Sequence, residues 1–358
     1  MAQLGRLIAS PITGADLPSL PTTDEDWAAL VQLAGDTRVL PALWRPLRPH
    51  RKAMPKETAE MIEAAEILNA DRNRKLLEAV QEVAHFLNNR GMTPVIFKGA
   101  AHLATDLWGS QGCRLIRDID ILLPESQAKR AQSFLAEAWG TDPAAGEDAL
   151  ASFSGKHEAP LETPSGFLVE MHWNVLPDWQ KHFLPTHEVR ARAKSLRLGH
   201  AEVMIPSPQD AVRIAMLHGP IGHQHYYAPM VVLRDLLDLL ALEKRHGTAI
   251  DWTAIQRHLA GLGWGSLPEI TNRQLATFLD HPLPFKRAGL RARLDAWRWQ
   301  AQLATPSLRQ IGDLGNRMAA TLRLIRRGGA HRKVAVDRLS QPAAYKRAAK
   351  RLVEGATG

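Results

Sequence analysis

Residues 93–124 have the sequence TPVIFKGAAHLATDLWGSQGCRLIRDIDILLP, and the Asp118-Ile119-Asp120 triplet near its end decides the fold. Successive side chains of a strand point to opposite faces, so Asp118 and Asp120 share one face. Two adjacent carboxylates repel each other unless a cation neutralises them. The expected cation is Mg²⁺, or Mn²⁺, because both prefer oxygen ligands. An ordinary half-exposed strand shows the same alternation, and the triplet alone leaves that alternative open.

The residues before the triplet predict a strand, a turn and a helix. Pro94 to Phe97 is a short apolar run, Lys98-Gly99 ends it, and residues 100–108 have helical spacing. Free backbone N–H groups at the start of a helix bind anions, and Lys98 adds a positive charge. Together with the paired aspartates, this pattern predicts a phosphate site, although a Lys-Gly pair by itself is typical of a plain turn.

The ordered motifs resemble the nucleotidyltransferase fold of the DNA polymerase beta superfamily. They are most similar to a poorly characterised bacterial branch, the uncharacterised nucleotidyltransferases. The shared motifs are Phe97-Lys98-Gly99, Arg114, Asp118 to Leu123 and Val169 to Trp173, and the resemblance spans about Met92 to Leu240. Most superfamily members have Gly-Ser where this chain has Gly99-Ala100, and their gap to the first Asp is shorter; the branch shares both departures. The resemblance implies an α+β core, a small mixed sheet with helices, flanked by N- and C-terminal helical regions.

A second strand is predicted over residues 166–175, GFLVEMHWNV, with Leu168, Glu170 and His172 on one face. The resemblance implies that Glu170 lies beside Asp118 and Asp120. A third acid of this kind completes a catalytic metal site and can help activate the attacking hydroxyl. His172 either orients a carboxylate or contacts substrate, and a purely structural role is equally compatible with its position.

Two arginines precede the Asp strand, and either can hold phosphate oxygens through the two-pronged guanidinium. Arg114 matches the arginine of the family and is preferred, and ion pairing to the aspartates is the alternative. The predicted metal ligands are Asp118, Asp120 and Glu170. The predicted nucleotide-binding residues are Lys98, Gly99, Ala100, Arg114, Arg117 and His172.

Composition restricts the class of protein. A chain of 358 residues that is 45% apolar can bury two or three cores. Its single cysteine, Cys113, can form no internal disulfide, and nothing nearby marks it as a nucleophile. No signal-like or membrane-length apolar run is present, so a cytoplasmic location is expected.

Positive charge is concentrated at the end of the chain. Residues 321–358 contain ten Lys or Arg and two acids, whereas the whole chain has a net charge of +8. The first 320 residues are therefore formally neutral. A basic tail predicts an anionic partner, nucleic acid or a membrane surface, and a merely solubilising tail is the alternative.

We predict an N-terminal helical region over residues 1–90, a core over 91–206, a helical domain over 207–320 and the basic tail. Residues 1–20 are predicted as a loop because of their prolines, and a helix is expected to start at Thr23. A long amphipathic helix or a kinked pair is expected over residues 57–89, with Leu68 on its apolar face. Ser126 is expected to cap a helix ending at Trp139.

Two further segments complete the prediction. Residues 141–165 are expected to form a mobile loop over the site. A helix is expected to start at Ser207-Pro208. His218, His223 and His225 form a cluster whose spacing matches no familiar zinc motif, so a structural or substrate-contacting role is predicted.

The predicted function is Mg²⁺-dependent transfer of a nucleoside monophosphate, from ATP or another NTP, to a hydroxyl or phosphate acceptor, with release of pyrophosphate. The acceptor can be RNA, a protein or peptide, or a small molecule. The alternative is a non-catalytic protein that binds nucleic acid or another partner and retains only the fold.

Overall fold

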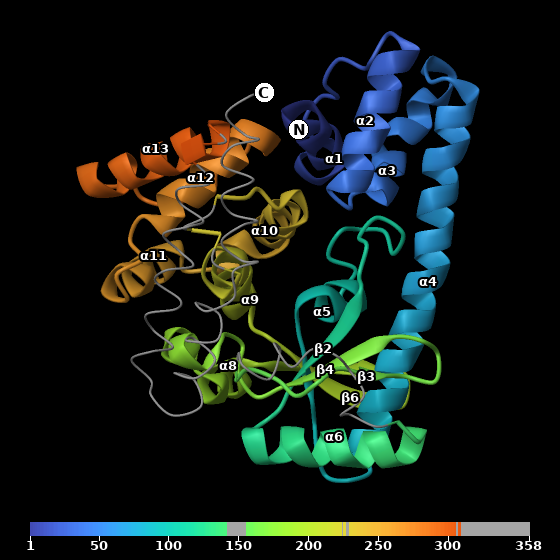
Figure 1. Ribbon diagram of the computed structural model, residues 1–358, viewed down its shortest axis with the longest axis vertical. Helices are drawn as coiled ribbons and strands as arrows, with labels where there is room; N and C mark the ends of the chain where they lie inside the picture. The colour runs from blue at the N-terminus through green and yellow to red at the C-terminus, as the bar shows by residue number, and fades with distance from the viewer. Residues whose placement is uncertain (142–154, 224, 227–228, 306, 309–358) are drawn as a thin grey trace, which may run out of the picture.

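The computed structural model describes residues 1–141, 155–223, 225–226, 229–305 and 307–308, and helices surround a single mixed sheet in it (Figure 1). The predicted basic tail lies outside the described residues, as does most of the predicted loop before Gly155. The helices are α1 (Ala2–Thr13), α2 (Asp24–Asp36), α3 (Trp44–Leu47), α4 (Lys56–Asn88), α5 (Lys98–Ala104), α6 (Glu125–Trp139), α8 (Thr186–Arg192), α9 (Pro208–Leu217), α10 (Leu233–His246), α11 (Trp252–Gly261), α12 (Leu267–Leu279) and α13 (Leu290–Ala304). The strands are β1 (Val95–Ile96), β2 (Asp118–Leu122), β3 (Leu161–Glu162), β4 (Leu168–His172), β5 (Lys194–Leu198) and β6 (Ala201–Ile205). The predicted α+β class is confirmed.

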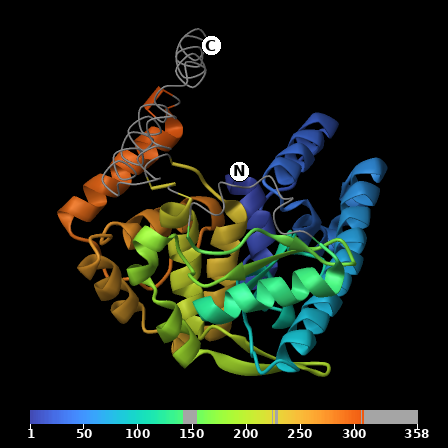
Figure 2. The same ribbon diagram turned by 60° about the horizontal axis from the view of Figure 1, so that its bottom comes forward.

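The strand order is β3-β4-β2-β1-β6-β5, with β2 near the centre. β2 and β4 run parallel, and Asp120 lies opposite Glu170 in their register. Paired positions on neighbouring strands point to the same face. The face that carries Ile119, Ile121 and Met171 packs against α4 and α6, as Figures 1 and 2 show. The three predicted metal ligands therefore point away from that core.

Helix α4 connects the two main cores. Near its start, Ala59 and Ile62 pack with the helical part of the molecule, whereas Leu76 and Val83 pack against the sheet. It is one continuous helix, as one of the two alternatives predicted. Leu68, however, is 70% exposed, so its predicted place on the apolar face is wrong. None of the helices in the described part of the chain has both the length and the apolarity needed to cross a membrane.

The first twenty residues contain α1, and the predicted loop is wrong. Leu4, Leu7 and Ile8 are buried at helical spacing, and α1 packs against α10 and α12. Pro11 favours a loop, but it lies in the last turn of the helix. The Leu7 carbonyl, which receives no N–H from Pro11, accepts the hydroxyl of Ser10 at 2.9 Å. The two ends of the described chain therefore share one helical core.

Helix boundaries test the predicted caps. Thr23 caps α2 by accepting the backbone N–H of Asp26, which confirms that prediction. α6 begins one residue before Ser126, after Pro124, so the predicted Ser126 cap is wrong. Proline at the N-cap serves here because its fixed φ leads directly into the helix.

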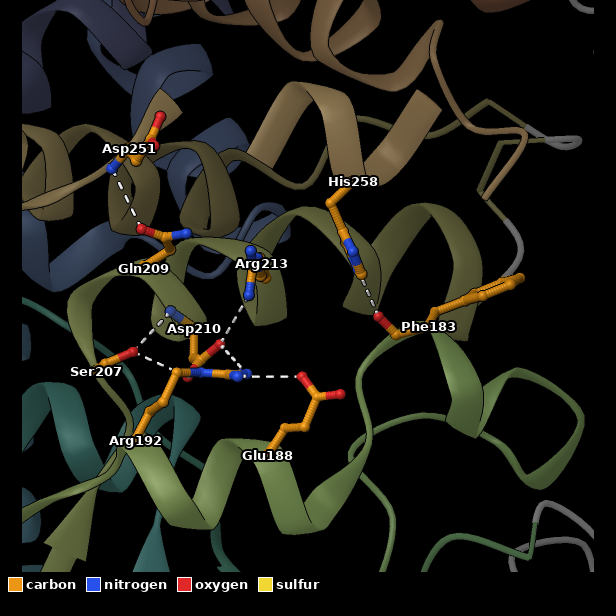
Figure 3. A network of polar contacts seen from close by, with 9 residues as sticks. All are labelled: Phe183, Glu188, Arg192, Ser207, Gln209, Asp210, Arg213, Asp251 and His258. Carbon is orange, nitrogen blue, oxygen red and sulfur yellow. Dashed lines mark hydrogen bonds and ion pairs between the residues drawn. The ribbon is translucent and has the colours of Figure 1, made fainter. Parts of the chain in front are cut away.

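The start of α9 is anchored by a buried carboxylate (Figure 3). Ser207 caps the helix, as predicted, by accepting the backbone N–H of Asp210. The fully buried Asp210 side chain accepts hydrogen bonds from Arg192 at 2.9 and 3.0 Å and from Arg213 at 3.3 Å. Charge-assisted bonds of this kind are the stronger class of hydrogen bond. α9 is thereby fixed to α8, and this matters because α9 forms one wall of the cavity described next.

Candidate active site

Asp118, Asp120 and Glu170 line one end of a cavity of about 510 Å³. Asp118 and Asp120 alternate on β2, and Glu170 comes from the neighbouring position of β4. Lys98, Gly99, Arg114 and Arg117 line the same cavity. The structure therefore brings together the predicted carboxylates and four of the six predicted nucleotide-binding residues. Their roles remain predictions.

Asp120 is the most strongly held of the three carboxylates. Lys98 Nζ lies 2.7 Å from Asp120 Oδ1, and His172 Nε2 lies 2.9 Å from the same oxygen. Burial opposes the charge of Asp120, but Lys98 and His172 hold its pKa well below its usual range. Burial also acts against Lys98, yet Asp120 raises the pKa of that amine. The pair is therefore ionised at neutral pH.

His172 orients carboxylates, which was one of its predicted alternatives. Its Nε2 also lies 3.0 Å from Glu170 Oε2, and its side chain is fully buried. Carboxylates accept, so Nε2 carries the proton and bridges Asp120 and Glu170. Burial would raise the pKa of Glu170, but the hydrogen bond from His172 lowers it to about 2. His172 does not line the cavity, so the structure places it behind the carboxylates.

Asp118 makes no ion pair with any described residue, which sets it apart from Asp120. Burial and the charge of Asp120 raise the pKa of Asp118 above its usual range, with Lys98 opposing them. An uncompensated carboxylate beside two others is the electrostatic setting in which a cation is stabilised. The three groups offer only oxygen donors, which fits Mg²⁺.

His157 places a second imidazole near Glu170, although it does not line the cavity. Its Nδ1 donates to the carbonyl of Glu158 at 2.6 Å, and Nε2 lies 3.6 Å from Glu170 Oε2. Burial and neighbouring His172 lower the pKa of His157 to about 4, so it is neutral at pH 7. Potential ligand atoms of His157, Glu170 and His172 lie within 4.8 Å of one another. Imidazole donors suit Zn²⁺ better than Mg²⁺.

Arg114 is the largest departure from prediction. Its Nε and Nη2 bind the two oxygens of Asp238 at 2.8 and 2.7 Å, and both residues are buried. Trp108 Nε1 donates to the same carboxylate at 2.8 Å. Although burial opposes it, Arg114 holds the pKa of Asp238 far below its usual range. The two nitrogens of Arg114 that were predicted to bind triphosphate therefore bind Asp238 of α10 in this structure.

Polar residues of α4 hold the loop that carries Arg114. Asn69 and Asn73 both donate to the carbonyl of Arg114, at 3.1 and 2.8 Å, and Arg72 bonds the carbonyl of Ile116. Asn69 and Asn73 are buried although helix surfaces normally carry such residues. Two asparagines at i and i+4 on a long helix are a sequence signal for such a role, and it was not predicted.

Gly99 and Ala100 serve packing. A Cβ at Gly99 would lie 2.7 Å from Arg114 Nη1 and 2.8 Å from a methyl carbon of Ile116. Gly99 therefore makes room for Arg114; it also lines the cavity, and the predicted close approach of a ligand to its backbone stays a prediction. Ala100 is fully buried in the core of the sheet and does not line the cavity, so its side chain takes no part in the predicted site.

Three residues that were not predicted to belong to the site also line this end of the cavity: Lys156, Arg234 and Asp235. Burial and nearby Lys98 lower the pKa of Lys156. Arg234 Nε is buried and makes no hydrogen bond to the described residues, although it forms a longer ion pair with Asp235 Oδ1 at 3.8 Å. A buried donor of this kind that lines a cavity can bind an anionic ligand.

The predicted histidine cluster is partly within the site. His218 Nε2 lies 3.2 Å from His223 Nε2, and both rings line the cavity. Burial lowers the pKa of His218 well below its usual range, and burial with nearby Lys156 lowers that of His223 to about 4. Both imidazoles are therefore neutral at pH 7 and can donate or accept hydrogen bonds, which agrees with a substrate-contacting role.

Residues 23–277 match the family model described as uncharacterised nucleotidyltransferase, and the chain belongs to this family. No curated protein matches the chain significantly. Among solved structures, an antigenic nucleotidyltransferase-like protein from Paracoccidioides brasiliensis is similar, at 17% sequence identity and a TM-score of 0.33. That alignment covers 59% of this chain and 94% of the other.

Proposed function

We propose that this protein transfers a nucleoside monophosphate from an NTP to an acceptor hydroxyl with the help of Mg²⁺, or Mn²⁺, as members of the DNA polymerase beta superfamily do. The supporting observation is the set Asp118, Asp120 and Glu170, which shares one face of the sheet and one cavity. Asp118 and Asp120, with Glu170, would hold the cation. When bound, the cation would neutralise charge on the phosphates and on the leaving pyrophosphate.

Cationic side chains at the same end would hold the phosphates. Lys156 has no ion pair within the described part of the chain, and Arg234 has its unsatisfied buried Nε. Both lie near the carboxylates. The charge of Glu170 acts to raise the pKa of Lys156, and the charge of Arg234 acts to lower the pKa of Asp118. Arg117 is exposed at the cavity rim and can add a third contact. In this proposal Lys156, Arg234 and Arg117 bind the phosphates, a role that was predicted for Arg114.

Asp235, which lines the cavity, is the proton acceptor in this proposal. The oxygen of the acceptor hydroxyl forms a bond to the α-phosphorus, the bond from that phosphorus to the bridging oxygen breaks, and pyrophosphate leaves. The hydroxyl proton passes to Asp235 Oδ. Burial and the charge of Asp238 raise the pKa of Asp235 to about 6, which suits a base that accepts a proton near neutral pH. Glu170, with its pKa of about 2, is a much weaker base.

Replacing Asp235 by Asn should raise the stability of the protein at neutral pH and lower its activity. The folded protein keeps a proton on Asp235 that the unfolded chain loses near pH 4, so wild-type stability falls as the pH rises from about 4 to about 6. We therefore expect Asp235→Asn to be more stable than the wild type at pH 7.5, by on the order of 2 kcal/mol, and no more stable at pH 4. Urea unfolding at both pH values measures this difference.

The same variant tests the proton transfer. The wild-type rate should rise through about pH 6, and Asp235→Asn should lose this step and most of the activity. Asp16→Asn, at an exposed loop position, is the control and should match the wild type in both measurements. A wild-type rate that does not change between pH 5 and 7 would remove Asp235 from the reaction.

Label transfer tests the proposed reaction itself. The full-length protein, each NTP labelled at the α-phosphate and Mg²⁺ are incubated with cell extract, and parallel reactions carry the label at the γ-phosphate. Nucleotidyl transfer places the α-label on a new product and the γ-label in pyrophosphate. Binding of NTP without transfer of either label would favour the alternative of a non-catalytic protein that retains the fold. A γ-labelled product would indicate phosphoryl transfer and contradict the proposal.

A further inference from the structure

Helices α9 and α10 line the cavity along their length. The lining residues of α9 share one helical face, Pro208, Ala211, Ile214 and Ala215, and His218 directly follows the helix. Those of α10 recur every three or four residues, at Asp235, Asp238, Leu242 and Arg245, and Arg234 and His246 lie beside them. Asp235 and Arg245 are ten residues apart on a continuous helix, which corresponds to about 15 Å. The cavity is therefore long, and the carboxylates occupy one end of it.

The other end is lined by cations and by no carboxylate. Its ionisable lining residues are Arg38, Lys194, Arg245 and His246, which come from three separate parts of the chain. Burial lowers the pKa of His246, and the charges of Arg245 and Lys194 lower it further. These three side chains therefore lie close together. Arg38 and Lys194 have no ion pair among the described residues. The nearest lining acid along α10 is Asp238, seven residues before Arg245, and Arg114 neutralises it.

Between the two ends the wall is largely apolar and aliphatic. Most of its lining residues are aliphatic, among them Leu107, Ile205, Ile214 and Leu242, and His102 and Thr105 are polar exceptions. No Phe, Tyr or Trp of the described chain lines the cavity. Bases of single-stranded nucleic acid bind proteins largely by stacking on such rings, so this wall is poorly suited to an RNA end. It suits an aliphatic or alicyclic segment.

Two helix ends lie beside the basic end. Arg38 follows α2 and Asp106 follows α5, with φ of +60° and +48°, the common left-handed conformation after the last turn of a helix. The carbonyl of Asp106 accepts Arg245 Nη1 at 2.9 Å, which holds that guanidinium at the basic end.

The nucleotide does not account for the basic end. Its charged groups must lie by the carboxylates, about 10 Å or more from Arg245, and its ribose and base carry no charge. We propose that the acceptor is a small anionic amphiphile, with a hydroxyl at one end and a carboxylate or phosphate at the other, separated by an apolar segment. This inference rests on the proposed function, because it assigns the acceptor of that reaction. A polycationic acceptor would be repelled from the basic end.

Binding of simple probes tests the proposal without requiring turnover. The probes are a medium-chain ω-hydroxyalkanoate, an ω-hydroxyalkyl phosphate, the neutral diol and the amino alcohol of equal length. Calorimetry with the full-length protein should show the two anions binding about tenfold tighter than the diol, and the amino alcohol binding weakest. The anionic advantage should shrink with added salt, because these cations are exposed. Comparing carboxylate with phosphate identifies the anion.

Two double variants distinguish binding by the cations that line the cavity from a general effect of positive charge. Lys194→Gln/Arg245→Gln removes two cations that line the basic end. Arg197→Gln/Lys244→Gln removes two exposed cations from the same strand and helix that do not line it. We expect only the first to lose the anionic advantage, by about tenfold. Lys244 also controls for the ordinary attraction of basic residues to the end of a helix.

Three outcomes would overturn the proposal. Equal binding of the anions and the diol removes the anion site, and equal loss in both double variants shows long-range charge only. Tighter binding of a short RNA, dependent on Lys194 and Arg245, would assign the basic end to nucleic acid. If the anions bind as expected but no NTP labels any of the four probes or extract components, the anion site stands and the proposed transfer fails.

Discussion

Asp118→Asn is expected to abolish nucleotidyl transfer while leaving the fold intact. The carboxylate has no cationic partner among the described residues, and burial and Asp120 raise its pKa. Removing its charge relieves repulsion in the folded protein, so stability at pH 7 should be unchanged or higher. Losing one of three carboxylates that would hold the cation should lower the transfer rate at least about a hundredfold. Initial rates and thermal unfolding measure the two effects.

Asp120→Asn provides the sharpest comparison, because it lies two residues away on the same face. It should also abolish transfer, but it leaves Lys98 buried without the partner that lies 2.7 Å away. Breaking a buried ion pair by removing one member is strongly destabilising, so a cost of about 2 kcal/mol or more is expected. Asp36→Asn, exposed at the end of α2, should change neither property. Full activity of Asp118→Asn, or its unfolding, would contradict the assignment of Asp118.

The centre of the site could be predicted because it depends on local periodicity. Alternation on β2 places Asp118 and Asp120 on one face whatever surrounds them. The side-chain caps at Thr23 and Ser207 are local for the same reason, since each bonds a backbone N–H three residues away. The place of Glu170 beside them required the resemblance, because nothing within β4 determines which strand it pairs with.

The rest of the cavity depends on long-range packing. Arg114 and Asp238 are 124 residues apart, and no periodic pattern links them. Lys156 and Arg234 approach the carboxylates only because two separate segments fold against the sheet. α1 was missed because proline was weighed as a helix breaker, although in the last turn it costs little when Ser10 satisfies the free carbonyl. Strand alternation therefore predicted the positions of the two carboxylates on β2, whereas long-range packing determines which side chains lie opposite them.

Arg114→Met should be among the most destabilising single changes in this chain. It leaves Asp238, only 4% exposed, without the guanidinium that binds both of its oxygens. Removing one member of a buried ion pair typically costs about 3 to 5 kcal/mol. Asp238 has a lowered pKa in the folded wild type, so its contribution to stability is present above about pH 4 and is lost as the pH falls. In Arg114→Met the uncompensated carboxylate can be protonated, so the cost of the mutation should shrink toward pH 4.

A double-mutant cycle distinguishes this structural role from the predicted nucleotide-binding role. Arg114→Met/Asp238→Asn has no buried charge left, so it should be more stable than Arg114→Met alone, and urea unfolding at pH 7.5 measures the coupling. Arg114→Lys keeps the charge but cannot bind both oxygens, and it should cost stability while NTP affinity per folded molecule stays near that of the wild type. A large loss of NTP affinity in a folded Arg114→Lys protein would return Arg114 to the nucleotide site. Because Arg114 stands between β2 and α10, its pairing with Asp238 is what we expect to hold the carboxylate end of the cavity together.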